Sequence, residues 1–181
     1  IDWALDAFDR HGIKVLLDVH AVRGSQNGFD NSGVANRTTW PDDNHFTHWE
    51  TQAADWMGHW NLDEQKYDSI NWDNIEFAKD TVRGLLDRWG NHPAVAALEP
   101  VNEPWNNSDL DVLKGFYRDV RNDMRDSHPH LTFVFHDSFI FDPNVWNDLF
   151  DDWDMENVVM DTHQYVAWWT PHDDHHEYCR D

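Results

Sequence analysis

The stretch AALEPVNEPW, residues 96–105, decides the fold. It begins as a short apolar run typical of a buried strand, and it ends with Asn102 and Glu103 side by side before Pro104. Because side chains alternate along a strand, Glu99 and Glu103 are expected on one face, with Glu99 deeper, where a carboxylate needs a cationic or hydrogen-bonded partner. Local chemistry alone permits a simpler interpretation, a strand that ends in a polar turn.

Three more apolar runs of this kind occur, at residues 13–20, 131–137 and 157–165. Apolar positions at helical spacing predict helices over residues 1–12, from an Asp73 or Asn74 cap to Trp89, from a Ser108 cap to Met124, and around 145–153. Strands that are apolar on both faces and alternate with helices imply a parallel sheet covered by helices. An open doubly wound sheet and a TIM barrel both satisfy this order.

Polar residues stand at the ends of all four predicted strands: His20; Asn102 and Glu103; His136 and Asp137; His163 and Tyr165. Barrel enzymes collect their chemistry at the carboxyl ends of several strands, whereas the glycine-rich phosphate loop of nucleotide-binding sheets is absent from the sequence. We therefore predict an α/β fold of the (β/α)8 TIM-barrel type. A full barrel has eight strands in about 250 residues, so this chain supplies roughly the middle half.

The composition of the 181 residues restricts the partners. Acidic residues outnumber basic ones 35 to 13, so the formal charge of -22 disfavours nucleic acid and anionic membranes. Residues 21–72 form a long Trp-rich loop, with a short hairpin or helix expected only around 49–60. The 12 tryptophans either pack in the core or provide platforms for sugar rings. No apolar run reaches the roughly 20 residues that a membrane span requires.

Three ordered motifs carry a family resemblance. The segments LEPVNEP (98–104), LLDVHAVRGSQNGFDNSG (16–33) and VVMDTHQY (158–165) closely resemble glycoside hydrolases of family 5, particularly their exo-1,3-β-glucanase branch. The resemblance implies that residues 1–181 are part of a single catalytic barrel that cleaves laminarin-type β-1,3-glucan with retention of configuration. It also implies no cofactor, no metal, and an extracellular, secreted or cell-wall location.

The resemblance assigns roles to individual residues. Glu103 matches the acid/base, which we expect to be kept protonated by an apolar mouth and a neighbouring carboxylate. The matches to substrate-binding positions are Asn102 for the sugar 2-hydroxyl, His20 lining the site, Phe29 and Asn31 for glucose, and His163 and Tyr165 for orienting sugar and nucleophile.

The nucleophile has no match. Retaining enzymes need two carboxyl groups about 5 Å apart, and in the family the second is a Glu on the seventh strand. The chain resembles strands three to six, so the missing strands are expected from the rest of a parent chain or from an assembly. Asp137, Asp161 and Glu177 are poor substitutes. Two alternatives stay open: a family 5 β-1,4-glucanase or mannanase, and a non-catalytic glucan-binding or structural protein.

The segment 172–177 is rich in His, Asp and Glu. It lacks the i, i+4 frame of a helical metal site, so we interpret it as a solvated acidic loop. Asn36 and Asn106 begin glycosylation sequons, and the single cysteine, Cys179, excludes an internal disulfide framework.

Overall fold

A parallel sheet forms the centre of the molecule. The computed structural model describes residues 1–33, 54–61, 63–64, 66–140, 142–149 and 156–165. Its sheet consists of β1 (Val15–Asp18), β4 (Val95–Glu99), β5 (Thr132–His136) and β6 (Val158–Asp161), in that order and all parallel. The predicted α/β class with a parallel sheet is confirmed.

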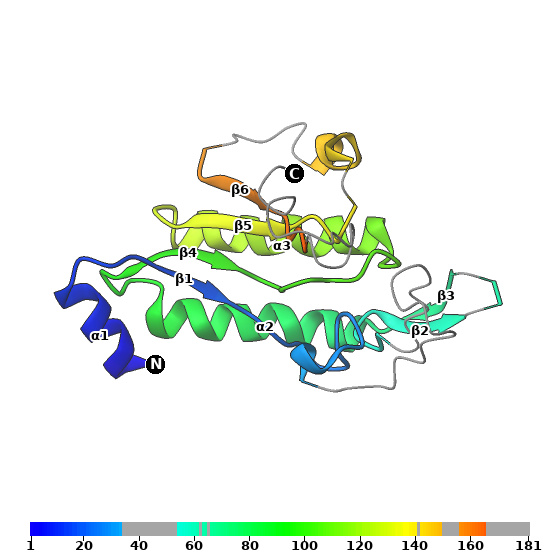
Figure 1. The fold of residues 1–181 in the computed structure, drawn as a ribbon, viewed down its shortest axis with the longest axis horizontal. Coiled ribbons are helices and arrows are strands. Elements are labelled where there is room, and N and C mark those ends of the chain that lie inside the picture. The colour runs from blue at the N-terminus through cyan, green and yellow to red at the C-terminus, as the bar shows by residue number, and fades with distance from the viewer. Residues whose placement is uncertain (34–53, 62, 65, 141, 150–155, 166–181) are drawn as a thin grey trace, which may run out of the picture.

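Three α-helices accompany the sheet: α1 (Asp2–Arg10), α2 (Trp72–Trp89) and α3 (Leu110–Ser127). Figure 1 shows α2 and α3 running along the sheet, as expected for helices that connect successive parallel strands. Ion pairs join the two helices, Lys79 to Asp119 at 2.9 Å and Arg83 to Asp123 at 2.7 Å. Among the helices that the structure describes, none has both the length and the apolarity needed to cross a bilayer.

The helix caps differ from the predicted ones. The side chain of Asn71 accepts the N–H of Asn74 at the start of α2, and that of Asp109 accepts the N–H of Asp111 at the start of α3. The predicted caps at 73 or 74 and at Ser108 were therefore wrong. Each predicted residue has the right chemistry, but the backbone turns helical at a different position, and only the residue just outside the first turn can reach the free N–H groups.

The core lies between the sheet and α2 and α3. Its buried apolar side chains come from the strands, from both helices and from the segments that follow β1 and precede β2. The largest fully buried ones are Trp56, Tyr117, Phe116, Phe133, Phe135, Met57 and Leu98. Several of the tryptophans are thus core residues, as the simpler interpretation of the composition holds.

The two outer strands of the sheet carry exposed apolar side chains. Leu16 on β1 is 43% exposed, and Val159 and Met160 on β6 are 49% and 40% exposed. Strands β1 and β6 each have one pairing partner within the described sheet. Exposed apolar side chains on an unpaired edge are a surface that further strands would cover.

The segment predicted as a loop over 21–72 contains regular structure. A 3-10 helix, η1, spans Asp30–Ser32, and an antiparallel hairpin joins β2 (Gly58–Asn61) to β3 (Lys66–Ile70). Gly58 has φ +150°, and a Cβ built there would lie 2.0 Å from the carbonyl oxygen of Ser69. Only glycine permits this close approach of the two strands. The short hairpin or helix expected around 49–60 is thus a hairpin that lies further along the chain, and its polar strands carry no alternation that would have placed it.

The helix predicted around residues 145–153 is a 3-10 helix, η2, spanning Pro143–Leu149. The rest of that prediction lies outside the described residues. So do the acidic cluster at 172–177, the sequon at Asn36, and Cys179.

Candidate active site

The site lies where the chain leaves β4. The strand ends at Glu99, and residues 100–103 bend away until Glu103 adopts a left-handed conformation with φ +47°. The expectation that Glu103 continues the alternation of the strand was therefore wrong, because the strand is four residues shorter than that expectation requires. The bend nevertheless buries both polar residues at its tip, Asn102 at 3% exposed and Glu103 at 5%.

The loop after β1 holds this bend in place. Asn102 donates its backbone N–H to the carbonyl of Val19 at 3.1 Å. The Gln26 side chain donates to the carbonyl of Asn102 at 2.8 Å, and the Asn27 side chain donates to the carbonyl of Glu103 at 3.1 Å. Gln26 and Asn27 belong to the motif at 16–33, although no role was predicted for either of them. The sequence signal was a pair of amide side chains flanked by glycines, which is typical of a loop held by side-chain hydrogen bonds.

Three side chains donate hydrogen bonds to the carboxylate of Glu103. Nδ1 of His163 and the hydroxyl of Tyr165 each lie 2.6 Å from Oε1, and Nδ2 of Asn31 lies 2.7 Å from Oε2. The donors come from the loop after β1 and from the chain just beyond β6. The structure thus brings together four of the seven predicted site residues, Glu103 and its three donors.

The donors set the charge of Glu103. Burial raises the pKa of its carboxyl group, but the hydrogen bonds from His163, Tyr165 and Asn31 lower it by more, so the net pKa lies below the usual value. The donors among the described residues therefore favour the ionised form of Glu103. The expectation that an apolar mouth and a neighbouring nucleophile keep Glu103 protonated stays a prediction, because it also invokes a carboxylate expected outside this chain.

His163 has a carboxylate at each ring nitrogen. Its Nδ1 bonds Glu103, and its Nε2 lies 3.3 Å from Oδ2 of Asp161. Burial lowers the pKa of the imidazole, but the two carboxylates raise it by more, so the net pKa is above 6.5. In the weakly acidic pH range, His163 is therefore expected as a cation and Glu103 as an anion.

His136, at the end of β5, is a site residue that the predicted set omitted. Its ring is fully buried and packs edge-on against His163, with ring centroids 4.6 Å apart. Burial and then the charge of His163 lower its pKa to about 4. Its Nδ1 accepts the backbone N–H of Ser138 at 3.0 Å, so the neutral ring carries its proton on Nε2. That Nε2 has no hydrogen-bond partner among the described residues.

Ligand atoms of Glu103, His136 and His163 lie within 4.8 Å of one another, which is a spacing that a metal ion could bridge. The positions of the protons on the two histidines argue against a metal ion here. Nδ1 of His136 already accepts from Ser138, so its Nε2 would have to lose a proton to bind a metal. The short bond of His163 to Glu103 likewise contains a proton.

Two further polar groups in the site have no partner among the described residues. The Nδ2 amide of Asn102 is a buried donor, and Oε1 of Glu99 is a buried acceptor. Burial, followed by the charges of Asp18 and Asp161, raises the pKa of Glu99 to about 8. The partner expected for Glu99 is not found for Oε1 in the described part of the chain, and the raised pKa keeps the carboxyl neutral instead.

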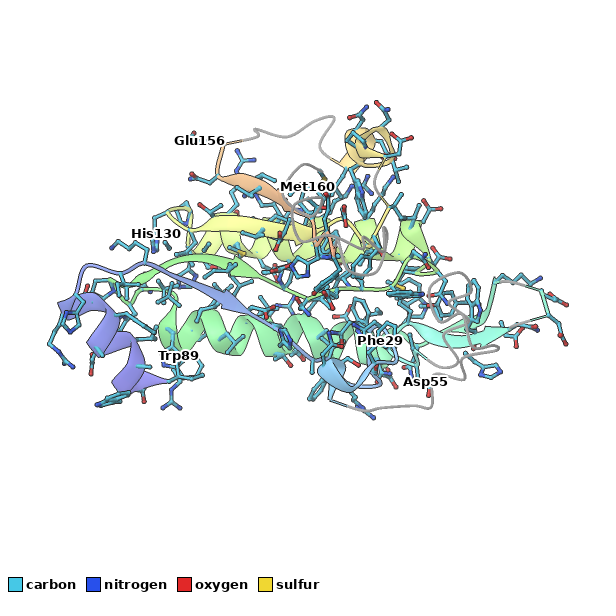
Figure 2. The ribbon with its side chains drawn as sticks, viewed as in Figure 1. Phe29, Asp55, Trp89, His130, Glu156 and Met160 are labelled. Carbon is cyan, nitrogen blue, oxygen red and sulfur yellow. The ribbon has the colours of Figure 1, made fainter. Side chains whose placement is uncertain are left out.

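Phe29 and His20 make contacts other than the hydrogen bonds of Glu103 described above. Phe29 packs edge-on against Trp105, which also contacts Phe139, at centroid distances of 4.9 and 5.1 Å. Figure 2 shows Phe29 beyond the ends of the parallel strands, on the side of the β2–β3 hairpin. His20 has a side chain 60% exposed, and its Nδ1 lies 2.6 Å from Oδ2 of Asp18. Their predicted roles toward sugar stay predictions.

The chain is similar in sequence to fungal glucan 1,3-β-glucosidases. It is 31% identical over 169 residues to the glucan 1,3-beta-glucosidase of Blumeria graminis and 32% identical over 168 residues to a probable glucan 1,3-beta-glucosidase A of Aspergillus terreus. Each alignment covers 91% of this chain and 32% of the relative. The chain therefore spans about a third of the length of the curated relatives that it matches. No family model matches the sequence.

Solved structures share the fold. The crystal structure of AoRut aligns with a TM-score of 0.59 at 21% identity, covering 90% of this chain and 41% of that one. Endo-glycoceramidase II from Rhodococcus sp. aligns with a TM-score of 0.57 at 17% identity, covering 91% and 43%. These neighbours are TIM-barrel glycoside hydrolases, so the predicted barrel architecture is confirmed, with this chain matching less than half of it. The predicted resemblance to β-glucan-cleaving glycoside hydrolases is likewise confirmed.

Proposed function

We propose, taking the likeness to glucan 1,3-β-glucosidases over nine-tenths of the chain as the premise, that the protein containing residues 1–181 is a retaining glycoside hydrolase acting on β-1,3-glucan. Glu103 is its acid/base, and the nucleophile is a carboxylate outside this chain. The observation that carries the proposal is the Glu103 carboxylate, buried at the carboxyl ends of parallel strands and bound by His163, Tyr165 and Asn31. The likeness to fungal glucan 1,3-β-glucosidases supports a secreted or cell-wall enzyme.

The acid step requires a proton on Glu103. A second carboxylate in the complete site supplies a negative charge, which raises the pKa of Glu103, and it competes for the donors His163 and Tyr165, which now lower that pKa. Both effects act in the direction that an acid needs. Glu103 then protonates the leaving oxygen and afterwards, as the carboxylate, activates water against the glycosyl-enzyme.

Asn102 provides the second half of this chemistry. Its buried Nδ2 donor has no partner among the described residues, and an unpaired buried donor costs about 1–3 kcal/mol. A sugar 2-hydroxyl is an acceptor that would satisfy it. The hydrogen bond strengthens as positive charge develops on the sugar ring, which stabilises the transition state more than the bound substrate.

The exposed apolar side chains on β1 and β6 support the expectation that further strands flank this sheet. Leu16, Val159 and Met160 would be covered by them. Residues 1–181 expressed alone should therefore associate or aggregate. Size-exclusion chromatography tests this expectation, and a soluble active monomer of this length would contradict it.

Replacing Glu103 by Gln in the full-length protein tests the acid/base role. Laminarin hydrolysis should fall by a factor of roughly 10² to 10⁴, because an amide cannot transfer the proton. Asp87→Asn, an exposed carboxylate on α2, is the matched control and should keep normal activity. Normal hydrolysis by Glu103→Gln would exclude the assignment. Parallel assays on carboxymethylcellulose and mannan decide the linkage.

A non-catalytic glucan-binding protein is the second candidate, and the lowered pKa of Glu103 favours it. A carboxylate held as an anion by three donors can bind sugar hydroxyls without any chemistry. This function predicts that the full-length protein binds laminarin by calorimetry but releases no reducing sugar. Any turnover that depends on Glu103 excludes it.

A further inference from the structure

The β2–β3 hairpin and the start of α3 form the two walls of an open groove. A cavity of about 420 Å³ lies between them, within the range of small-molecule binding sites. It combines two aromatic rings of the hairpin with amides and carboxylates of the segment that follows the Glu103 bend. Its lining, termed the hairpin groove, includes Trp60, Lys66, Tyr67, Asn106, Asn107, Asp109 and Asp111.

The aromatic wall of the groove is built by a cross-strand pair. Trp60 on β2 pairs with Tyr67 on β3, and their rings meet edge to face with centroids 5.0 Å apart. Both side chains are half-buried. Burial, followed by the charges of Asp109 and Asp55, raises the pKa of the Tyr67 hydroxyl, which therefore stays protonated. Aromatic rings with a neutral hydroxyl suit the apolar face and the hydroxyl rim of a sugar.

The opposite wall is polar and negative. Asn106 and Asn107 supply amides, and Asp109 and Asp111 supply carboxylates at the start of α3. Lys66 also lines the groove, but its charge is balanced by Glu64 at 2.6 Å, so the two aspartates leave the lining net negative. A groove with unbalanced negative charge repels anionic ligands and leaves hydrogen bonding to neutral hydroxyls as the favourable interaction.

The groove is tied to the active site by a short and anchored segment. Asn106 is three residues after Glu103, and Trp105 lies between them. The Trp105 backbone donates to the carbonyl of Gln26 at 3.3 Å, and its carbonyl accepts from the Ser138 hydroxyl at 2.6 Å. Figure 1 shows the hairpin beyond the sheet on the side toward which β1 and β4 run, the side of the Glu103 bend.

We propose that the hairpin groove is a second carbohydrate-binding subsite, which takes neutral glucose units of the same chain whose glycosidic bond lies at Glu103. The inference rests on the proposed function and explains how the protein distinguishes long from short glucans. Long chains occupy the groove and the catalytic site together, whereas a disaccharide occupies the catalytic site alone. The groove therefore contributes to the affinity for long substrates only.

Trp60→Ala in the full-length protein tests the subsite. For laminariheptaose the KM should rise roughly tenfold, the loss expected when one aromatic anchor is removed, while kcat stays unchanged. For laminaribiose both constants should stay unchanged. Trp60→Phe should restore most of the affinity because it keeps an aromatic face. Trp72→Ala, a 59% exposed indole outside the groove, is the matched control.

Two results overturn the inference: unchanged KM for laminariheptaose in Trp60→Ala, or an equal loss in Trp72→Ala. Binding measured by calorimetry separates a failure of this inference from a failure of the proposed function. If the full-length protein hydrolyses no glucan, the proposed function fails, but weaker laminariheptaose binding by Trp60→Ala still supports the groove. An anionic oligogalacturonide should not bind, and binding of it at the affinity of laminariheptaose would contradict the neutral ligand class.

Discussion

Replacing Glu99 by Gln should change how the stability of the protein depends on pH. Glu99 is 2% exposed, its Oε1 has no partner among the described residues, and its pKa is raised to about 8 from 4.5. A carboxyl group with a raised pKa binds a proton in the folded state that the unfolded chain releases. Folding stability is therefore fully retained below pH 4.5 and falls as the pH rises toward 8.

The size of the effect follows from the two pKa values. Each pH unit between 4.5 and about 8 costs about 1.4 kcal/mol of unfolding free energy, so the total loss above pH 8 is about 5 kcal/mol. Glutamine has the same shape and no titration, so the variant lacks this loss. Relative to wild type, Glu99→Gln should gain nothing at pH 4 and several kcal/mol at pH 9.

Urea unfolding of the full-length protein at pH values from 4 to 9 measures this difference. Asp87→Asn, an exposed carboxylate on α2, is the control and should show a small difference from wild type at every pH. A difference between Glu99→Gln and wild type that does not vary with pH would refute the reasoning, because it would mean that Glu99 titrates alike in the folded and unfolded chain.

The structure also predicts the effects of substitutions at Tyr165 and at two glycines. Tyr165→Phe removes a hydrogen bond that lowers the pKa of Glu103, so the alkaline limb of the pH–rate profile on laminarin should move to higher pH; a shift to lower pH would contradict the assignment of the donor. Gly58→Ala places a Cβ 2.0 Å from the Ser69 carbonyl oxygen and should lower the melting temperature. Gly84→Ala, inside α2, adds a Cβ that meets open space and should stabilise the protein by about 0.5–1 kcal/mol. Equal effects of the two substitutions would show that the close approach at Gly58 is not native.

The strands and helices were largely predictable because each element buries an apolar set with clear spacing. The runs at 131–137 and 157–165 contain β5 and β6, although β6 ends at Asp161, and helices follow the predicted spacing from 74 to 89 and from 110 to 124. The β2–β3 hairpin was not predictable to the residue, because its polar strands carry no alternation and its tight approach depends on Gly58. Helix ends depend on backbone geometry, which is why Asp109 rather than Ser108 is the cap.

The candidate site was predictable in part. Glu103, Asn31, His163 and Tyr165 come together as the motifs indicate, because polar residues at the carboxyl ends of parallel strands converge. The charge of Glu103 was not predictable, since it depends on hydrogen-bond geometry and not on residue type. His136 was seen at a strand end but not assigned, because only the structure shows which of its nitrogens is occupied.

The hydrogen bonds of Glu103 also have a kinetic meaning. Its partner Asn31 is 72 positions earlier in the chain, and His163 and Tyr165 are 60 and 62 positions later. Contacts between residues so far apart in sequence form only after large loops have closed, and proteins dominated by such contacts fold slowly. The ionised carboxylate is therefore assembled late, and during synthesis the ribosome must release residue 165 before Glu103 gains its last two donors. A nascent chain that stops short of β6 carries Glu103 without them.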